Sequence, residues 1–254
     1  MNPVLEASHV CHTYPDGTQA IRDVTFAVAA GESVGIIGAN GAGKSTLLLH
    51  LVGCLFPSEG TLTVGGIVAK ANTVTAIRQQ VGLVFQNPDD QLFMPTVQAD
   101  VSFGPRNQGL TEEEVRLRVR QALDAVGELH LLERPPYRLS GGEKRAVSIA
   151  TVLAMEPDIL VLDEPSAGLD PTARRKVIRL LRGFNHTRIV ASHDLDLVLE
   201  MCQRVILMRA GQVIADGICA EILRNAQLLS DCGLELPLSL QACPVCNPVP
   251  CGRT

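Results

Sequence analysis

The sequence has no run of apolar residues close to the length of about eighteen that is needed to cross a lipid bilayer. Residues 1–6 also lack the basic start and the long apolar core of a signal peptide. From these two absences we expect a soluble, cytoplasmic protein, for which any link to a membrane runs through other proteins.

Blocks of basic residues are absent as well. The formal net charge of −5 is modest and the lysines and arginines are dispersed, so we expect no nucleic acid as a direct ligand. No internal repeat is visible. With 254 residues, 46% of them hydrophobic, the length suits one domain that carries an inserted lobe.

The eight cysteines fall into two groups. Five are scattered through a chain large enough to build a core without disulfides, and we expect reduced, mostly packed thiols at Cys11, Cys54, Cys202, Cys219 and Cys232. The other three, Cys243, Cys246 and Cys251, lie in a tail rich in cysteine and proline over residues 241–254. Their spacing allows a soft metal to bind, but we expect a flexible tail with incidental or redox-reactive thiols.

A glycine-rich segment follows the apolar residues 34–37 and precedes a leucine-rich stretch. The spacing of Gly38, four residues and then Gly43-Lys44-Ser45 is typical of a P-loop, whose backbone N–H groups surround phosphate oxygens at a helix N-terminus. An ordinary βα turn is the alternative, and the strand-to-helix context argues against it. We expect Lys44 to neutralise the β- and γ-phosphates and the Ser45 hydroxyl to bind Mg²⁺. The expected nucleotide-binding residues are Gly38, Ala39, Asn40, Gly41, Ala42, Gly43, Lys44, Ser45 and Thr46.

Three other apolar segments end in polar residues, as buried parallel strands do where they deliver side chains to a ligand. Residues 159–162 lead into Asp163, expected to hold Mg²⁺ directly or through water, and Glu164, expected to polarise the water that attacks the γ-phosphate. Residues 81–85 lead into Gln86, which can reach the metal or that water. Residues 188–192 lead into His193, which is either a structural histidine or part of the phosphate site.

The remaining segments predict the architecture. Apolar and polar side chains alternate over residues 4–28 on either side of the turn 15–17, as in antiparallel strands. Tyr14 precedes that turn and is either a core or edge tyrosine or a ring that stacks on a purine. Residues 87–139 have helical periodicity, and Ser140-Gly141-Gly142 then begins another helix, as a simple N-cap or as a second anion site. Residues 205–215 predict a hairpin. We therefore expect an α/β P-loop NTPase fold with a parallel core sheet, an N-terminal antiparallel β subdomain and an inserted α-helical subdomain.

These motifs, in this order, resemble those of the ATP-binding-cassette (ABC) ATPases over roughly residues 4–225. Ser140, Gly141 and Gly142 match the signature motif, Gln86 the Q-loop, Asp170 the D-loop and His193 the switch histidine, while Tyr14 matches the aromatic residue that stacks on adenine. Glu143 stands where many members carry glutamine, which is a known variant. The resemblance implies an ATPase domain over residues 1–240, with its helical lobe at about 87–157 in a RecA-like core.

The resemblance also implies a mechanism. ATP and Mg²⁺ are the expected cofactors, Glu164, His193 and Gln86 the catalytic residues, and Ser45, Gln86 and Asp163 the metal ligands. A second ATPase subunit, in a homodimer, caps the ATP held by Lys44 with its own signature motif. The resulting motion passes to a transmembrane coupling subunit, contacted by Asp89, Asp90 and Phe93, and to a substrate-specific membrane subunit.

Residues 86–93, with residues 101–105, are similar to those of the energy-coupling-factor importers, particularly the cobalt and nickel branch. The same ATPase role in an importer for a vitamin, an amino acid or a sugar is the main alternative. A soluble ABC protein of DNA repair or translation fits poorly, because it needs a long coiled-coil insertion or two cassettes in one chain.

Overall fold

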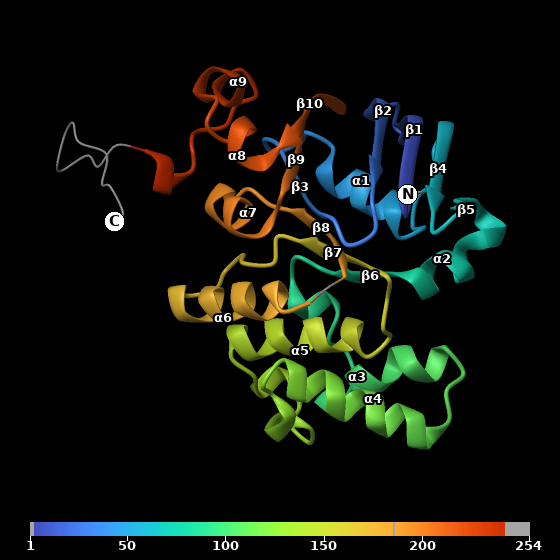
Figure 1. The fold of residues 1–254 in the computed structure, drawn as a ribbon. Helices are drawn as coiled ribbons and strands as arrows, with labels where there is room; N and C mark the ends of the chain where they lie inside the picture. Colours follow the sequence, from blue (N-terminus) through green and yellow to red (C-terminus); the bar gives the residue numbers. More distant parts are fainter. Residues whose placement is uncertain (1–2, 185, 242–254) are drawn as a thin grey trace.

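The structure is a computed structural model that describes residues 3–184 and 186–241, in which two β-sheets and a helical lobe are arranged around the chain's first glycine-rich loop (Figure 1). The smaller sheet is antiparallel, as the alternation over residues 4–28 predicted, with β1 pairing both β2 and β4. Its strand order is β2-β1-β4-β5. The strands are β1 (Leu5–Thr13), β2 (Gln19–Val28), β4 (Glu59–Val64) and β5 (Ile67–Val68).

The larger sheet has six strands in the order β10-β9-β3-β8-β7-β6. All neighbours are parallel except β10, which forms the predicted hairpin with β9. This order places β8 between β3 and β7, so the carboxyl ends of these three strands lie side by side. The strands are β3 (Ser33–Ile37), β6 (Val81–Val84), β7 (Ile159–Asp163), β8 (Thr187–Ala191), β9 (Arg204–Arg209) and β10 (Gln212–Ile218).

Helices cover the parallel sheet, whose central strands are buried on both faces: every residue of β3 is buried. One core lies between the two sheets and around α1, and a second lies on the opposite face against α6 and α7. The expected fold class is therefore confirmed. The helices outside the lobe are α1 (Lys44–Leu51), α2 (Val74–Gln80), α6 (Pro171–Arg182), α7 (Leu195–Met201), α8 (Cys219–Ile222) and α9 (Ala226–Asp231).

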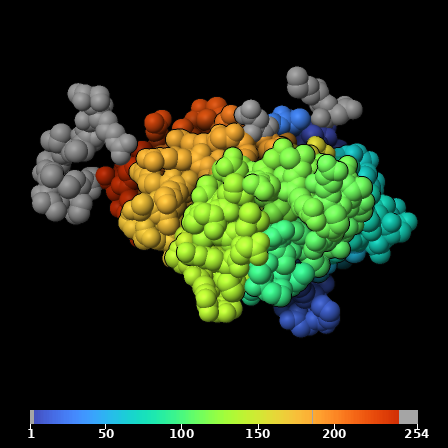
Figure 2. Space-filling model, turned by 90° about the horizontal axis from the view of Figure 1, so that it is seen from below, coloured from blue at the N-terminus to red at the C-terminus, as the bar shows by residue number. Residues whose placement is uncertain are grey.

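The helical lobe consists of α3 (Val97–Asn107), α4 (Glu112–Ala125) and α5 (Gly141–Leu153). Capping boxes begin α4 at Thr111 and α5 at Ser140, where side chain and backbone satisfy each other's free N–H groups. The lobe has a core of its own and forms the centre of the face seen in Figure 2. It lies inside the range 87–157, while a single ATPase domain over residues 1–240 stays a prediction.

The cysteines that the structure describes are free thiols, as expected, and three of them, Cys202, Cys219 and Cys232, are buried. Cys243, Cys246 and Cys251 lie outside the described residues, so the predicted character of the tail stays a prediction. Over residues 3–184 and 186–241, none of the helices combines the length and apolar character required of a membrane span.

Candidate nucleotide-binding site

The glycine-rich loop ends at Gly43, which is the N-cap of α1 and has a left-handed backbone with φ of 100°. A side chain there is excluded on two grounds, because the conformation suits glycine and an added Cβ would lie 2.7 Å from the carbonyl oxygen of Ala20. No side chain caps α1 and no acidic residue lies in its first turn. The N–H groups of this helix end are thus available to an anion, as the P-loop prediction requires.

Lys44 extends back over its own loop. Its Nζ donates to the carbonyl oxygens of Gly38 at 2.7 Å and Ala39 at 3.2 Å. Burial lowers the pKa of Lys44, and the nearby charges of Glu164 and Asp163 oppose that shift. A phosphate group at this position would favour the charged form of the ammonium in the same way.

The ends of β3, β8 and β7 bring the sequence-predicted residues to one cleft. The glycine loop, Asp163, Glu164 and His193 line a single cavity of about 910 Å³, together with Tyr14 and Gln86. Residues from five separate parts of the sequence therefore meet where a nucleotide would lie on the loop.

Glu164 is 7% exposed, and the segment that follows β8 supplies hydrogen-bond donors to its carboxylate. Its Oε2 accepts from the Ser192 hydroxyl at 2.9 Å and lies 2.8 Å from Nδ1 of His193, while Oε1 accepts from the His193 backbone N–H at 2.9 Å. Because a carboxylate oxygen is an acceptor, we assign a proton to Nδ1 of His193. The backbone of Glu164 is left-handed, with φ of 46°, a strained conformation that is typical of functional sites.

Asp163 lies at the end of β7 and offers the second carboxylate. Its pKa is raised by burial and by the charge of Glu164, and is lowered in turn by Lys44 and by the Ser45 hydroxyl. Ser45 and Asp163 thus present hard oxygen donors beside a concentration of negative charge, the donor set that suits Mg²⁺.

Tyr14 lies at the rim of the cleft, where β1 approaches α1. Its hydroxyl is 3.2 Å from Oγ1 of Thr46, and its ring meets that of His12 edge-on at 4.8 Å. The His12 ring packs in the same way against the fully buried His50 of α1, at 4.6 Å. The side chain of Tyr14 is therefore held by Thr46 at its hydroxyl and by His12 at its ring.

Gln86 is exposed at the end of β6 and lines both the nucleotide cleft and a neighbouring cavity that reaches Asp89 and Lys144. The backbone on either side of it is held by Arg145 of α5, a fully buried side chain that donates to the carbonyl oxygens of Phe85 at 2.6 Å and Gln86 at 2.5 Å. The sequence did not single out Arg145, because an arginine in a helical pattern gives no sign of burial.

The signature residues lie elsewhere. Ser140, Gly141, Gly142 and Asp170 line a separate hollow that includes neither the glycine loop nor Glu164. In this chain Ser140 is an N-cap: its Oγ accepts from the Glu143 N–H at 3.3 Å, and the Glu143 carboxylate accepts from the Ser140 N–H at 2.7 Å. Asp170 likewise caps α6, accepting from Thr172 and Ala173.

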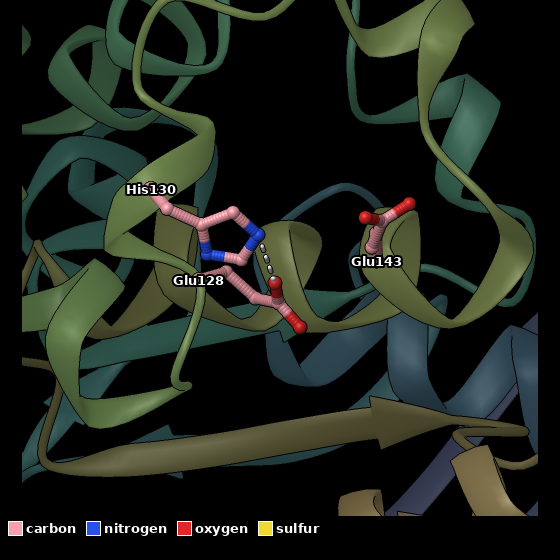
Figure 3. Close-up of side chains that lie close together, drawn as sticks. All are labelled: Glu128, His130 and Glu143. Atoms are coloured by element: carbon pink, nitrogen blue, oxygen red, sulfur yellow. Dashed lines mark ion pairs between the residues drawn. The ribbon is translucent and has the colours of Figure 1, made fainter.

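The charged groups around this helix end come from the turn after α4. His130 forms a 3.9 Å ion pair with Glu128, and both side chains point toward the Glu143 carboxylate at the start of α5 (Figure 3). Burial raises the pKa of Glu128, and the charge of Glu143 adds to the shift. The signature residues and the glycine loop therefore line separate hollows, although Gly141 also lines a neighbouring cavity together with Ser45 and Asp163.

Comparisons with known proteins agree with this geometry. The sequence profile described as ABC transporter matches residues 21–167. A putative ABC transporter ATP-binding protein of Geobacter sulfurreducens is 58% identical over 96% of this chain and 98% of its own length. The energy-coupling factor transporter ATP-binding protein EcfA of Methanothermobacter thermautotrophicus is 46% identical over 92% of this chain and 77% of its own. The structure of cbiO1 from Clostridium perfringens, described as part of the ABC transporter complex cbiONQ, has a TM-score of 0.81 and 38% identity, covering 93% of this chain and 97% of that one.

Proposed function

The chain belongs to the ABC transporter family, as an ATPase of the energy-coupling-factor type, and we propose that it is the ATP-hydrolysing subunit that energises a membrane importer of cobalt or nickel ions. The observation that carries the proposal is the meeting of the glycine loop with Asp163, Glu164 and His193 in one cleft. A phosphate cradle alone binds nucleotides, whereas a buried carboxylate beside it supplies the base for hydrolysis.

The residues of the cleft divide the reaction among them. Lys44 and the N-terminus of α1 hold the phosphates, and the ring of Tyr14 stacks on adenine. The Oε1 atom of Glu164, which has one protein donor, accepts the proton of the attacking water, while His193 contacts the γ-phosphate. Ser45, Asp163 and Gln86 would hold Mg²⁺, which would supply charge neutralisation at the phosphates.

The separation of the signature residues from the glycine loop supports a dimer. Ser140, Gly141 and Gly142 lie at a helix N-terminus, and the hollow that these three residues line together includes no residue of the glycine loop of the same chain. In a two-fold dimer the same helix end faces the partner's nucleotide, so each site is completed by the second copy. Closure on ATP and opening after hydrolysis then follow from the contacts that the γ-phosphate makes.

A groove between the helical lobe and the parallel sheet supports the proposal that the chain binds a membrane-embedded partner protein. It has a volume of about 620 Å³ and is lined by Phe85, Phe93 and Phe103, of which Phe93 is 63% exposed. The ring centroids of Phe93 and Phe103 are 5.2 Å apart, which makes a continuous aromatic surface. Exposed aromatic patches of this kind mark protein interfaces, and we assign this one to the coupling subunit at the cytoplasmic face of the membrane.

Asp100, on the same groove, indicates the chemistry of that partner. It is 3% exposed, its Oδ1 accepts from the N–H groups of Phe93 and Met94, and its Oδ2 has no partner among the described residues. Burial raises the pKa of Asp100. A partner helix with apolar residues and one cationic side chain would fill the groove and satisfy this oxygen. Asp90 also stays exposed nearby, whereas Asp89 is paired with Lys144 at 2.6 Å.

The cobalt or nickel assignment is supported by the sequence pattern of residues 86–93 and 101–105. Uptake of labelled cobalt and of labelled nickel in a strain lacking the chain tests it directly. We expect uptake of one of these ions to fall and to be restored by the wild-type gene. Unchanged uptake of both ions, with loss of a vitamin, amino acid or sugar, would replace the assignment by that cargo.

The enzymatic part of the proposal is tested by Glu164→Gln. Because the amide cannot accept a proton, we expect ATP to bind with unchanged affinity while turnover is lost and a closed dimer accumulates on size exclusion. Near-wild-type turnover would exclude Glu164 as the catalytic carboxylate. Glu156→Gln, an exposed change on the lobe side of β7, is the matched control and should leave turnover intact.

A further inference from the structure

We propose that Ser192 is a positioning residue for ATP hydrolysis, whose hydroxyl fixes one oxygen of Glu164 and leaves the other free to act as the base. The inference rests on the proposed function, because it acts through Glu164. It concerns a side chain that the sequence motifs did not single out, one residue before His193.

The position of Ser192 follows from the strand order. It comes directly after β8, which lies between β3, the strand that leads into the glycine loop, and β7, the strand that ends in Asp163. Its backbone N–H donates to the carbonyl oxygen of Ile36 in β3 at 3.3 Å, and its hydroxyl reaches across to Glu164. Ser192 thus ties the end of the catalytic strand to the strand that carries the P-loop.

The direction of the hydroxyl proton is determined by its neighbours. The Ser192 Oγ accepts from the backbone N–H of Asp194 at 3.1 Å and lies 2.9 Å from Oε2 of Glu164. A backbone N–H is only a donor and a carboxylate only an acceptor, so the single proton of the hydroxyl is donated to Glu164. Because Ser192 is 0% exposed, water does not compete for this bond.

The two oxygens of Glu164 are consequently unequal. Oε2 is close to three donors, which are the Ser192 hydroxyl at 2.9 Å, Nδ1 of His193 at 2.8 Å and the His193 N–H at 3.2 Å. Among the described residues, Oε1 accepts from the His193 N–H alone, at 2.9 Å, and retains acceptor capacity for a water. Two of the three bonds to Oε2 come from His193, whose side chain is 67% exposed, so Ser192 supplies the anchor from the buried side.

Removal of this anchor should affect turnover and not nucleotide binding. The terminal torsion of a glutamate has a broad energy minimum, so the carboxylate of a Ser192→Ala variant would rotate more freely away from the water. A hydrogen bond to a charged group is worth on the order of a ten- to hundredfold change in rate, and we expect kcat to fall by that factor. We expect the ATP dissociation constant to remain within about twofold, since Ser192 does not line the cleft.

The experiment measures steady-state ATP turnover and, separately, nucleotide affinity for the full-length chain and a set of variants. Ser192→Thr retains the hydroxyl and should keep the wild-type kcat, whereas Ser192→Cys has nearly the same shape, donates weakly and should resemble Ser192→Ala. Ser33→Ala is the matched control, because Ser33 is an equally buried serine whose hydroxyl donates to the carbonyl oxygen of Met201 at 2.8 Å, remote from the cleft. It should lower stability without lowering kcat.

Single-turnover rates in the Glu164→Gln background complete the test. If Ser192 acts through Glu164, then Ser192→Ala has no further effect once the carboxylate is gone. The proposal is overturned if folded Ser192→Ala or Ser192→Cys keeps a kcat within about twofold of Ser33→Ala, or if the loss persists undiminished in the Glu164→Gln background. A wild-type chain without ATPase activity would instead overturn the proposed function itself.

Discussion

Lys44 shows how a single residue can be prepared for its ligand. Its ammonium donates to the carbonyl oxygens of Gly38 and Ala39 and does not reach the carboxylates at the end of β7. Carbonyl oxygens are weaker partners for a cation than phosphate oxygens, so these two bonds can be exchanged when a nucleotide enters. The lowered pKa of Lys44 comes chiefly from burial, which makes the gain from a charged ligand larger.

We therefore expect Lys44→Ala to raise the ATP dissociation constant by roughly ten- to a hundredfold, the range for losing a hydrogen-bonded charge pair. The measurement is a titration with a fluorescent ATP analogue. Lys70→Ala, at an exposed lysine beside β5, is the control and should bind as the wild type does. Equal affinities for Lys44→Ala and wild type would contradict the P-loop assignment.

At the scale of the element, α3 carries a carboxylate of which the fold uses only one oxygen among the residues described. Asp100 is in the first turn of α3, where its Oδ1 holds the preceding loop through two N–H groups. Its other oxygen is buried without a partner among the residues described. Burial of this oxygen without a hydrogen-bond partner lowers the stability of the folded chain. Such a cost is expected where a residue serves an interface with another protein.

The pKa of Asp100 is raised in the folded chain, so the folded state is favoured at low pH and loses that advantage as pH rises through the folded pKa. Asp100→Asn removes the buried charge while it keeps a carbonyl oxygen for the two N–H groups. We expect it to be more stable than wild type at pH 7, with the gain disappearing as pH falls below the pKa of Asp100 in the folded chain, as measured by thermal unfolding.

The same variant should weaken assembly with membrane subunits, because an amide cannot pair with a cationic side chain of the partner. Co-purification from detergent-solubilised membranes measures this. Asp124→Asn, at an exposed position in α4, is the control for both experiments. If Asp100→Asn copurified the membrane subunits as wild type does, Asp100 would have no part in the interface.

The elements also show which features of the site can be predicted from the sequence and which cannot. The glycine loop and the acids after β7 were predicted, because glycine spacing and strand-end carboxylates follow local rules. Ser192, Arg145 and Asp100 were missed. Their roles depend on which strand or helix lies beside them: Ser192 matters because β8 is next to β7, and Arg145 because α5 packs under the end of β6. A serine before a strand-end histidine was the one local signal available.

At the scale of the whole molecule, the residues that we propose to bind the nucleotide line two hollows, and a third cavity, lined by Ser45, Asp163 and Gly141, shares residues with both. The glycine loop and Glu164 share one cleft, and the signature residues share another hollow with Asp170. In a monomer, neither hollow would contain all of the residues that we expect around a bound nucleotide. In the two-fold dimer that we propose, the start of α5 of each copy would face the glycine loop of the other, so that ATP would form part of the interface and its hydrolysis would release the two copies.

This division predicts that two inactive variants restore each other. Lys44→Ala disables the glycine loop but keeps the signature residues. Gly141→Asp does the reverse: an added Cβ at Gly141 has no atom within 4 Å, so the fold tolerates it, while the new charge repels a phosphate. In a mixed dimer one site receives both defects and the other receives none.

We expect each variant alone to hydrolyse ATP poorly and an equimolar mixture to approach about a quarter of wild-type turnover, because half of the dimers are mixed and each has one intact site. If the mixture were only as active as the average of the two variants, the site would be complete within one chain, and the two surfaces would serve separate purposes.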